Sequence, residues 1–346
     1  MKNILFIGLG SIGQRHLKNI LRLKKSFKYF AIRKTKLAPE LDFKNNVQSN
    51  KFECQKFSIK EISVKASLLL KIDIVFVCNP SSMHIASALP YAKRGSNLFI
   101  EKPLSNNLKQ IKHLGKIIEQ KKIKCAVGYQ LRYDPTLSKI KKIITGREMG
   151  LIKKVSIKNA HYLPNHHKYE DYRVGYAARE SLGGGVLLCF IHEIDYANFL
   201  FGKATKINCE GGKKSNLDID VEDFAKIKID YKLKDNSFVA TLDLDFIKKK
   251  ESRFCKIFFE KGFLKWDLSS NTLFISPTKG KKQLINSKLR DRNSLFFKQI
   301  KDVIKKIENK KEPKSNYVNG VYSLKVALAA KESMKVKKSI FLNSFL

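Results

Sequence analysis

The sequence lacks the features by which several classes of protein are recognised. In its 346 residues no apolar run approaches the ~18 residues that a membrane-spanning helix needs. Its cysteines form no CxxC pair, and such scattered spacing indicates neither a zinc site nor a disulfide framework. The six cysteines are Cys54, Cys78, Cys125, Cys189, Cys209 and Cys255. We therefore expect reduced, mostly buried thiols, no bound metal and a place in the cytoplasm.

Acidic residues are also scarce. The chain has 31 of them against 69 lysines and arginines, which gives a formal charge of +38. Such a surface attracts polyanions, including nucleic acids and nucleotide phosphates. The lysines, however, are spread along amphipathic stretches, and no basic arm, zinc finger or RNA-binding motif accompanies them. We therefore predict no specific nucleic-acid partner.

The N-terminus lacks the pattern of a signal peptide. One lysine is followed by an apolar run that glycines interrupt, without a small-residue cleavage site, and this predicts a first β-strand. Further strand patterns follow at 28–33, 51–57, 72–79, 97–103 and 123–130. Helical patterns separate them at 11–23, 58–70, 81–95 and 105–122. Repeated βα units at this density predict a doubly wound parallel sheet.

After about residue 130 the pattern changes to alternating apolar and polar residues, which predicts a largely antiparallel sheet with one covered face. Helical patterns occur near 184–201, 294–309 and 318–335. In "CKIFFEKGFL" (255–264) apolar residues fall on both sides of the strand. We expect the outer face of this sheet to be buried against a second subunit, in a homo-dimer or homo-tetramer.

The stretch "GLGSIG" has the GxGxxG spacing behind the first strand. Gly8 permits a tight turn, Gly10 lets the backbone approach a pyrophosphate, and Gly13 allows the helix to pack closely on the strand. The helix that begins at Ser11 and Ile12 would present free N–H groups to the phosphates. The fold class is therefore α/β: an N-terminal Rossmann domain (1–122) and a C-terminal α+β domain on an open, mainly antiparallel sheet (123–346).

The acidic residue that binds the ribose 2′-hydroxyl of NAD is missing about 20 positions on. Arg33 and Lys34 stand at the end of the second strand instead. Cations there suit a 2′-phosphate and slightly favour NADP over NAD. In a chain with 69 basic residues, chance also places two of them there.

Longer motifs extend this interpretation. "VFVCNPSSMH" (75–84) and "LFIEKPLS" (98–105) resemble the glucose–fructose oxidoreductase / inositol dehydrogenase / MocA family of NAD(P)-dependent sugar oxidoreductases. The resemblance continues through "VGYQLRYDP", "SLGGGVLLCFIHEIDYANFLFG" and "GFLKWDL", and so covers nearly the whole chain. The triplet Glu101-Lys102-Pro103 is its most specific mark. The segments 161–173 and 183–202 resemble a subgroup linked to sialic-acid-like sugars and surface polysaccharide synthesis.

The resemblance implies roles for particular residues. Those expected to hold the cofactor, besides the glycine loop, are Asn79, Pro80, His84, Glu101, Lys102 and Arg132. Those expected to bind the sugar are Tyr162, Asp171, Tyr172, Arg173 and His192. The first of these two groups would line the nicotinamide side of the site, with Arg132 near both cofactor and substrate.

Hydride transfer is the cofactor's own chemistry, so the protein needs to supply positioning and a route for a proton. Lys102 can donate a hydrogen bond to the reacting oxygen. His192 is the candidate general acid or base, because an imidazole titrates near neutral pH. A lone helical histidine is by itself more often a core residue, and the role of His192 rests on the resemblance.

The sequence departs from the family at one catalytic position. Relatives of the subgroup carry an aspartate three residues before the histidine, where this chain has Cys189; elsewhere in the family the aspartate lies at the position of Leu188. Lys102 and His192 could suffice with slower turnover, or Asp171 or Glu193 could substitute. The third alternative is an impaired relative that binds nucleotide as a sensor or scaffold. Cys189 itself could be a reactive thiol, although inert packing is commoner.

The stretch "HYLPNHHKYEDYR" (161–173) brings three histidines close to two carboxylates. Both residue types are zinc ligands, but no cysteine or regular helical spacing supports a metal site. We interpret this segment as a substrate-side loop.

Overall fold

The computed structural model describes residues 1–34, 38–286 and 291–345. The chain divides into two compact units. The first comprises Met1–Gln130 and Asp291–Val321, and the second Leu131–Arg290 and Tyr322–Leu346. This division differs from a cut after residue 122, because the strand at 125–127 pairs within the first sheet and a helix from the C-terminal part packs on the first helix.

The first unit is built on a parallel sheet of six strands, in the order β5-β2-β1-β6-β7-β8. Every neighbouring pair in it is parallel. The strands are β1 (Lys2–Ile7), β2 (Phe27–Ile32), β5 (Ile59–Glu61), β6 (Ile74–Val77), β7 (Asn97–Ile100) and β8 (Cys125–Val127). Strand order reverses between β1 and β6, and the doubly wound fold that the βα pattern predicts is confirmed.

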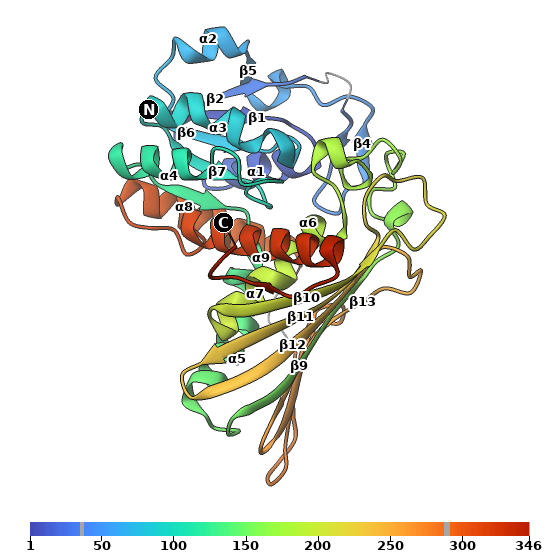
Figure 1. Ribbon diagram of the computed structural model, residues 1–346. Helices are drawn as coiled ribbons and strands as arrows, with labels where there is room; N and C mark the ends of the chain where they lie inside the picture. Colours follow the sequence, from blue (N-terminus) through green and yellow to red (C-terminus); the bar gives the residue numbers. More distant parts are fainter. Residues whose placement is uncertain (35–37, 287–290, 346) are drawn as a thin grey trace. The chain divides into compact units, whose positions relative to one another are not determined.

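Helices cover this sheet on both faces. The connection after β1 leads towards β2 and the connection after β6 leads towards β7, on the other side of the sheet. Right-handed connections in these two directions place their helices on opposite faces. The helix after β1 packs on α8, and the helix after β6 packs on α4 (Figure 1). The helices are α1 (Ser11–Leu21), α2 (Val64–Leu68), α3 (His84–Lys93), α4 (Ile111–Gln120) and α8 (Asn293–Glu308). A small hairpin, β3 (Glu40–Leu41) with β4 (Val47–Ser49), lies between β2 and β5 in the chain.

One strand prediction is wrong. The segment 51–57, expected as a strand, ends in a 3₁₀ turn at Gln55–Phe57, and the strand that pairs with β2 is Ile59–Glu61. The helix expected over 58–70 is only Val64–Leu68. Phe52 and Cys54 have the spacing of a strand, but they reach the core from irregular backbone, and Phe57 packs against the same core.

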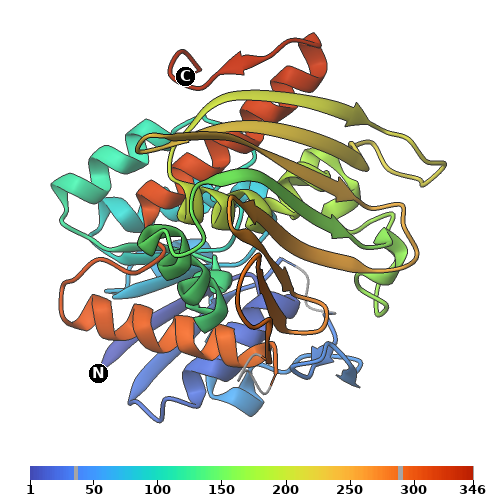
Figure 2. The same cartoon turned by 90° about the horizontal axis from the view of Figure 1, so that it is seen from below.

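The second unit is built on a nine-stranded sheet in the order β16-β15-β14-β13-β9-β12-β11-β10-β17. Only β9 and β12 pair in parallel; the other neighbours are antiparallel, as predicted. The strands are β9 (Ile152–Ala160), β10 (Ala204–Gly212), β11 (Phe224–Leu233), β12 (Asn236–Asp245), β13 (Ser252–Phe259), β14 (Gly262–Asp267), β15 (Thr272–Pro277), β16 (Gln283–Asn286) and β17 (Ile340–Phe341). Figure 2 shows the green β9 among the yellow and orange strands.

One face of this sheet is covered by helices. The four helices with residues in the second unit are α5 (Pro135–Gly146), α6 (Val186–Cys189), α7 (Ile191–Phe201) and α9 (Tyr317–Val336), whose first turn belongs to the first unit. In α7 every residue but Phe199 is buried, and this helix contacts β9 and β11. Over the described ranges, no helix is long and apolar enough to cross a membrane.

Candidate functional site

The glycine loop lies at the carboxyl end of β1, and its three glycines differ in what a side chain would meet there. Gly8 has a φ of +93°, which L side chains rarely adopt. A Cβ at Gly13 would collide with the carbonyl oxygen of Gly8. At Gly10 a Cβ would meet no atom within 4 Å. The fold therefore needs glycine at 8 and 13, whereas at 10 it leaves open space in front of the N-terminus of α1.

The end of β6 faces this loop. A Cβ on Gly8 would lie 2.9 Å from the Asn79 backbone nitrogen, so the two strand ends are in close contact. Asn79 Nδ2 donates to Ser87 Oγ at 2.8 Å, while its buried Oδ1 has no hydrogen-bond partner among the described residues. An acceptor left open beside an open glycine loop, at the reversal of strand order, suits a dinucleotide.

Pro80 directly precedes the short turn Ser81–Met83 that leads to His84. The two ring nitrogens of His84 lie 2.8 Å from the carbonyl oxygens of Asn79 and Pro103. Burial lowers the pKa of His84 below its ordinary value, although the carbonyls oppose this. His84 thus links the end of β6 to the segment after β7 and is buried rather than presented to a ligand.

Glu101 and Lys102 follow β7 directly, and the peptide bond between Lys102 and Pro103 is cis. The Glu101 carboxylate points inward: its Oε1 lies 2.6 Å from His16 Nε2. Its Oε2 accepts a hydrogen bond from the Lys102 backbone N–H at 3.0 Å. The most specific motif of the sequence therefore starts with a buried acid tied to the helix of the glycine loop.

The end of β2 carries the two predicted cations, but they are placed differently. The Arg33 side chain is only 4% exposed, and its Nη1 donates to the Phe52 carbonyl at 3.0 Å and lies 3.8 Å from Glu61. Lys34 is exposed. Arg33 therefore ties the segment before β5 to β2, which leaves Lys34 as the better placed of the two to meet a ligand.

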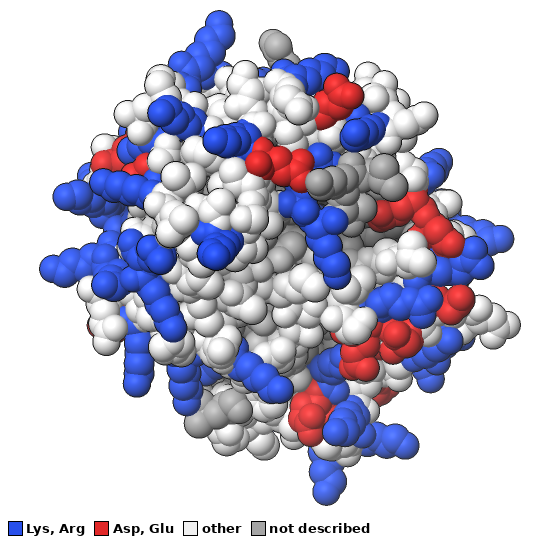
Figure 3. All heavy atoms as spheres, turned by 90° about the horizontal axis from the view of Figure 1, so that it is seen from above, with Lys and Arg blue, Asp and Glu red and all other residues white. Residues whose placement is uncertain are grey.

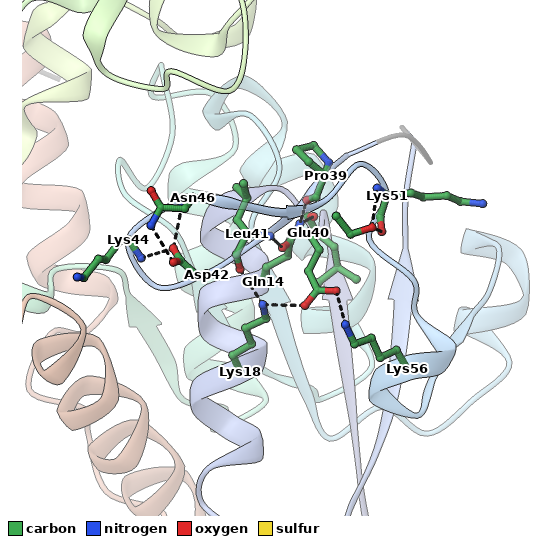
Figure 4. A network of polar contacts seen from close by, with 12 residues as sticks. Gln14, Lys18, Pro39, Glu40, Leu41, Asp42, Lys44, Asn46, Lys51 and Lys56 are labelled. Atoms are coloured by element: carbon green, nitrogen blue, oxygen red, sulfur yellow. Dashed lines mark hydrogen bonds and ion pairs between the residues drawn. The ribbon is translucent and has the colours of Figure 1, made fainter.

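A polar network holds the hairpin after β2 on helix α1 (Figure 4). Gln14 Nε2 donates to the Pro39 carbonyl at 2.8 Å, and the Leu41 N–H donates to Gln14 Oε1 at 2.9 Å. Glu40 accepts from Lys18 and Lys56 at 3.3 and 2.9 Å. Burial alone would raise the pKa of Glu40, but the two lysines hold it below its usual value. The network fixes the chain beside the N-terminal turns of α1.

In the second unit, Cys189 ends α6 and His192 lies in the first turn of α7, and both are buried. The carboxylates near them in the chain have other partners. Glu193 is fully buried and accepts from Arg253 Nε at 2.7 Å. Asp195 is bound by Arg132, whose Nε and Nη2 each donate at 2.9 Å.

Arg132 is therefore part of a buried ion pair within the second unit. Ser323 Oγ adds a third hydrogen bond to Asp195, at 3.0 Å. Burial raises the pKa of Asp195 above its ordinary value, although Arg132 and Ser323 oppose this. This bidentate arrangement holds the guanidinium in one orientation.

The predicted substrate loop lies largely at the surface. Asp171 is paired with Arg173 at 2.7 Å, and the Asp218 N–H donates to Tyr172 Oη at 3.3 Å. The hydrogen bonds from Arg173 hold the pKa of Asp171 below its usual value. Tyr162 directly precedes a 3₁₀ turn at Leu163–Asn165. Asp171, one of the two carboxylates proposed to replace the absent aspartate, is thus exposed and paired with Arg173.

The histidines of the same loop lie close together, and the rings of His161 and His166 meet edge-on at 5.3 Å. His161 Nδ1 lies 2.6 Å from Glu251, and His167 Nδ1 lies 2.7 Å from Glu170. The rings of His166 and His167 stack at 4.6 Å. A hollow beside them is about large enough for one water molecule and too small for a sugar ring. In the part of the chain that is described, no group of three or more His, Cys, Asp and Glu side chains could hold a metal ion.

The sequence does not mark His16 as a functional residue. His16 lies inside "GLGSIGQRH" and shares the buried side of α1 with Leu17 and Ile20. A histidine at an apolar position of a helix is a signal for a buried polar contact, but its partner, Glu101, is 85 positions away. The contact could therefore not be found from local spacing.

Lysines and arginines are scattered over the face seen in Figure 3, with uncharged surface between them. No continuous basic band is visible there. This distribution agrees with lysines spread along the sequence.

Comparison with known proteins decides the family. Residues 2–129 match the NAD-binding Rossmann domain of the oxidoreductase family named for glucose–fructose oxidoreductase, inositol dehydrogenase and MocA. Residues 141–342 match the C-terminal alpha/beta domain of the same family. The chain belongs to this family. Its Rossmann domain is an NAD-binding domain of that family, and the family resemblance of the motifs is confirmed.

The chain is similar to several inositol dehydrogenases. It is 25% identical to scyllo-inositol 2-dehydrogenase (NAD⁺) of Bacillus subtilis over 57% of this chain, and it spans about half (53%) of that relative's length. It is 23% identical to myo-inositol 2-dehydrogenase of Thermotoga maritima over 96% of both chains. In fold it is similar to levoglucosan dehydrogenase solved with NADH and levoglucosan, with a TM-score of 0.82, 16% identity and 99% coverage of both.

Proposed function

We propose that the protein is an NAD(P)-dependent oxidoreductase that transfers a hydride between nicotinamide and a carbinol or ketone of a sugar, nucleotide sugar or sugar acid. The observation that carries the proposal is the glycine loop at the reversal of strand order, with open space at Gly10 and an unused acceptor on Asn79. Family membership over both domains supports it.

The cofactor would be held by Gly8, Gly10, Ser11, Ile12 and Gly13 at its pyrophosphate. Asn79 and Pro80 would line its nicotinamide side, and His84, which the sequence also assigns there, would support them from behind through the Asn79 and Pro103 carbonyls. Bound there, it supplies the hydride chemistry itself. Lys102 donates a hydrogen bond to the reacting oxygen, and His192 holds or accepts the proton of that oxygen. These two roles are assigned from the family motifs.

The proposed cofactor preference is for NADP. Lys34 supports it as an exposed cation at the end of β2, where a 2′-phosphate is recognised. Arg33 supports it less than the sequence indicates, because its guanidinium is buried against Phe52 and Glu61. Replacing Lys34 by a neutral residue should therefore lower the ratio of NADPH to NADH affinity more than the same replacement of Arg33.

For the substrate we propose a polyhydroxylated ring. The relatives support this by their names: they act on inositols, and a protein of the same fold binds levoglucosan. Tyr162, Asp171, Tyr172 and Arg173 are the proposed sugar contacts, and the link of the loop to sialic-acid-like sugars stays part of this proposal. Asp171 and Arg173 would recognise a sugar as a preformed pair.

The alternative function is that of a catalytically impaired relative that binds nucleotide as a sensor or scaffold. The observation that favours it is Cys189, a buried thiol where the family carries an aspartate. Glu193 and Asp195 are both held by arginines. Either carboxylate of α7 would therefore have to act with an arginine bound to it.

Titration with NADPH and NADH, followed by nicotinamide fluorescence, tests the proposed function. It is run at moderate salt with excess ATP, because a chain of charge +38 binds polyphosphates loosely. We expect saturable binding that survives ATP. Gly10→Ala should weaken it about tenfold or more without loss of thermal stability, since a Cβ there meets only open space. Gly146→Ala, where a Cβ makes ordinary contacts, is the matched control.

Binding of neither nucleotide, or equal binding by Gly10→Ala, would end the dinucleotide interpretation. Turnover then separates enzyme from sensor: in a screen of polyols, sugars and sugar nucleotides, Lys102→Met should reduce it about a hundredfold or more. Cys189→Asp should raise it. A protein that binds NADPH while neither the wild type nor Cys189→Asp turns over any substrate in the screen fits the sensor.

A homo-oligomer is proposed through the outer face of the nine-stranded sheet. Phe254, Phe258 and Phe263 lie half-buried on that face, with Lys256 within 4.6 Å of two of the rings. Such an apolar surface on a single chain marks an interface. Light scattering should show a dimer or tetramer, and Phe258→Asp should yield monomer. A monomeric wild type would contradict this.

All six cysteines are described; they are buried and none takes part in a disulfide, which fits a reducing compartment. We therefore propose the cytoplasm as the place of action.

A further inference from the structure

The buried pair of His16 and Glu101 has a feature that ordinary core contacts lack. A carboxylate is costly to bury unless it is paired and hydrogen-bonded, and an apolar pair of the same volume is often at least as stable. Glu101 is nevertheless 6% exposed and His16 fully buried. The fold keeps a charged group here, one residue before Lys102.

The His16 ring is enclosed by aromatic side chains. It lies edge-on to Phe99 at 4.7 Å and to Phe296 at 5.9 Å, and tilted against Phe76 at 6.1 Å. Its Nδ1 is buried and has no hydrogen-bond partner among the described residues. The contact of Nε2 with Glu101 is therefore the one hydrogen bond that the ring forms with described residues.

The Glu101 carboxylate is in turn held on three sides. Oε1 accepts from His16, and Oε2 accepts from the Lys102 backbone N–H. On the third side lies Gly128, where any Cβ would be 2.7 Å from Oε1. The glycine after β8 therefore makes room for the carboxylate. The conformation of the carboxylate is set by contacts from α1 and from the residues that follow β7 and β8.

The same carboxylate is close to the glycine loop. Burial, and to a lesser degree the charge of Glu101, raises the pKa of Cys78 well above its usual value. Cys78 precedes Asn79 and contacts the loop, since a Cβ on Gly13 would lie 3.4 Å from its Cβ. Glu101 thus lies where the glycine loop, the end of β6 and the backbone of Lys102 converge.

We propose that His16 and Glu101 are positioning residues that fix Lys102 relative to the glycine loop through the chain His16 Nε2–H, Glu101 carboxylate and Lys102 N–H. This rests on the proposed function, in which Lys102 lies beside the nicotinamide. His16 belongs to the helix whose N-terminus would meet the pyrophosphate. The pair therefore connects α1, which would bind the pyrophosphate, to Lys102, which would lie beside the nicotinamide.

ADP-ribose provides the test, because it is the cofactor without its nicotinamide. Affinities for NADH and for ADP-ribose are measured by calorimetry on the full chain for the wild type, His16→Leu and His16→Gln. In His16→Leu the Kd for NADH should rise about tenfold, while that for ADP-ribose changes by less than about twofold. His16→Gln can place its amide N–H where Nε2 lies and should restore binding of NADH.

Two further variants separate positioning from stability. Asn19 lies on the same helix and forms a buried amide pair with Asn293, at 2.9 and 3.0 Å. Asn19→Leu also removes a buried polar contact, but it should affect both ligands equally or not at all. In a Lys102→Met background, His16→Leu should cause no further loss of NADH affinity, because its effect passes through Lys102.

The outcomes are distinguishable. If the wild type binds neither NADH nor NADPH, the proposed function fails and this inference with it. If it binds NADPH alone, the same comparison is made with NADPH and the 2′-phosphate of ADP-ribose. If the wild type binds both the dinucleotide and its ADP-ribose counterpart, but His16→Leu changes neither affinity or changes both alike, only the positioning role fails. The same holds if Asn19→Leu reproduces the pattern, if His16→Gln is as impaired as His16→Leu, or if the effect persists without Lys102.

Discussion

Each unit contains a buried carboxylate with a nitrogen partner from a distant element, but the two pairs differ in kind. In the second unit Asp195 accepts two parallel hydrogen bonds from Arg132 and a third from Ser323. In the first unit Glu101 accepts one from a histidine and one from the backbone of Lys102. The guanidinium is always charged, whereas the imidazole can be neutral.

This difference separates structural support from positioning. Arg132 and Asp195 neutralise one another and fix α7 to the segment before α5, so removal of one partner leaves a full charge in the core. Glu101 keeps the backbone N–H when His16 is lost, and its second contact is with a residue of the proposed site. The pair in the second unit should therefore control stability, and the pair in the first unit should control the geometry of binding.

The largest effect is expected for Arg132→Leu, which leaves Asp195 buried without its main partner. The loss in free energy of unfolding should be about 3–5 kcal/mol. Urea unfolding followed by tryptophan fluorescence measures it, because the single tryptophan, Trp266, lies in the same unit and packs on Tyr196 of α7 at 5.4 Å. The double variant Arg132→Leu/Asp195→Leu should be less destabilised than the single one.

The deficit should also depend on pH. Burial already raises the pKa of Asp195, and Arg132 opposes this, so loss of Arg132 raises it further. A carboxyl whose pKa is raised on folding contributes stability at low pH that is lost as the pH rises through the folded-state pKa. The deficit of Arg132→Leu should therefore be larger at about pH 8 than at about pH 5. A deficit independent of pH, or a double variant as unstable as the single one, would contradict this account.

A smaller effect is expected for Gly128→Ala in the first unit. The new Cβ would lie 2.7 Å from Glu101 Oε1, so the carboxylate must move away from His16. We expect a loss of about 1–3 kcal/mol in stability, as for other overpacked sites, together with weaker NADH binding. Thermal unfolding and the NADH titration measure the two effects, with Gly10→Ala as the variant that changes binding alone. Unchanged binding in Gly128→Ala would show that the Glu101 carboxylate can move without consequence.

The elements of the fold were largely predictable because local patterns carry them. The GxGxxG spacing identified the turn after β1, and period-two alternation identified the second sheet. The segment 51–57 was mistaken for a strand because Phe52 and Cys54 are core residues on irregular backbone. A pattern of burial alone does not distinguish a strand from a loop that reaches the core.

The sequence predicted which residues form the candidate site, but it did not predict the contacts of their side chains. Arg33 was expected to meet a phosphate, and the structure buries its guanidinium against Phe52 and Glu61. The partner of His16 lies 85 residues away, and that of Arg132 lies 63 residues away. Contacts of this kind depend on how the strands are ordered, which no local spacing records.

By itself the sequence determined the classes of element, the two-part architecture, the glycine loop and the family, because each of these is written in residue types at short separation. Only the tertiary structure decided which charged groups are buried and with whom. Burial is a property of the packed chain: the cost of a carboxylate such as Glu101 or Asp195 depends on the water removed from it and on the donors that replace that water. These donors are brought in by other elements, so the roles of His16 and Arg132 became visible only in the fold.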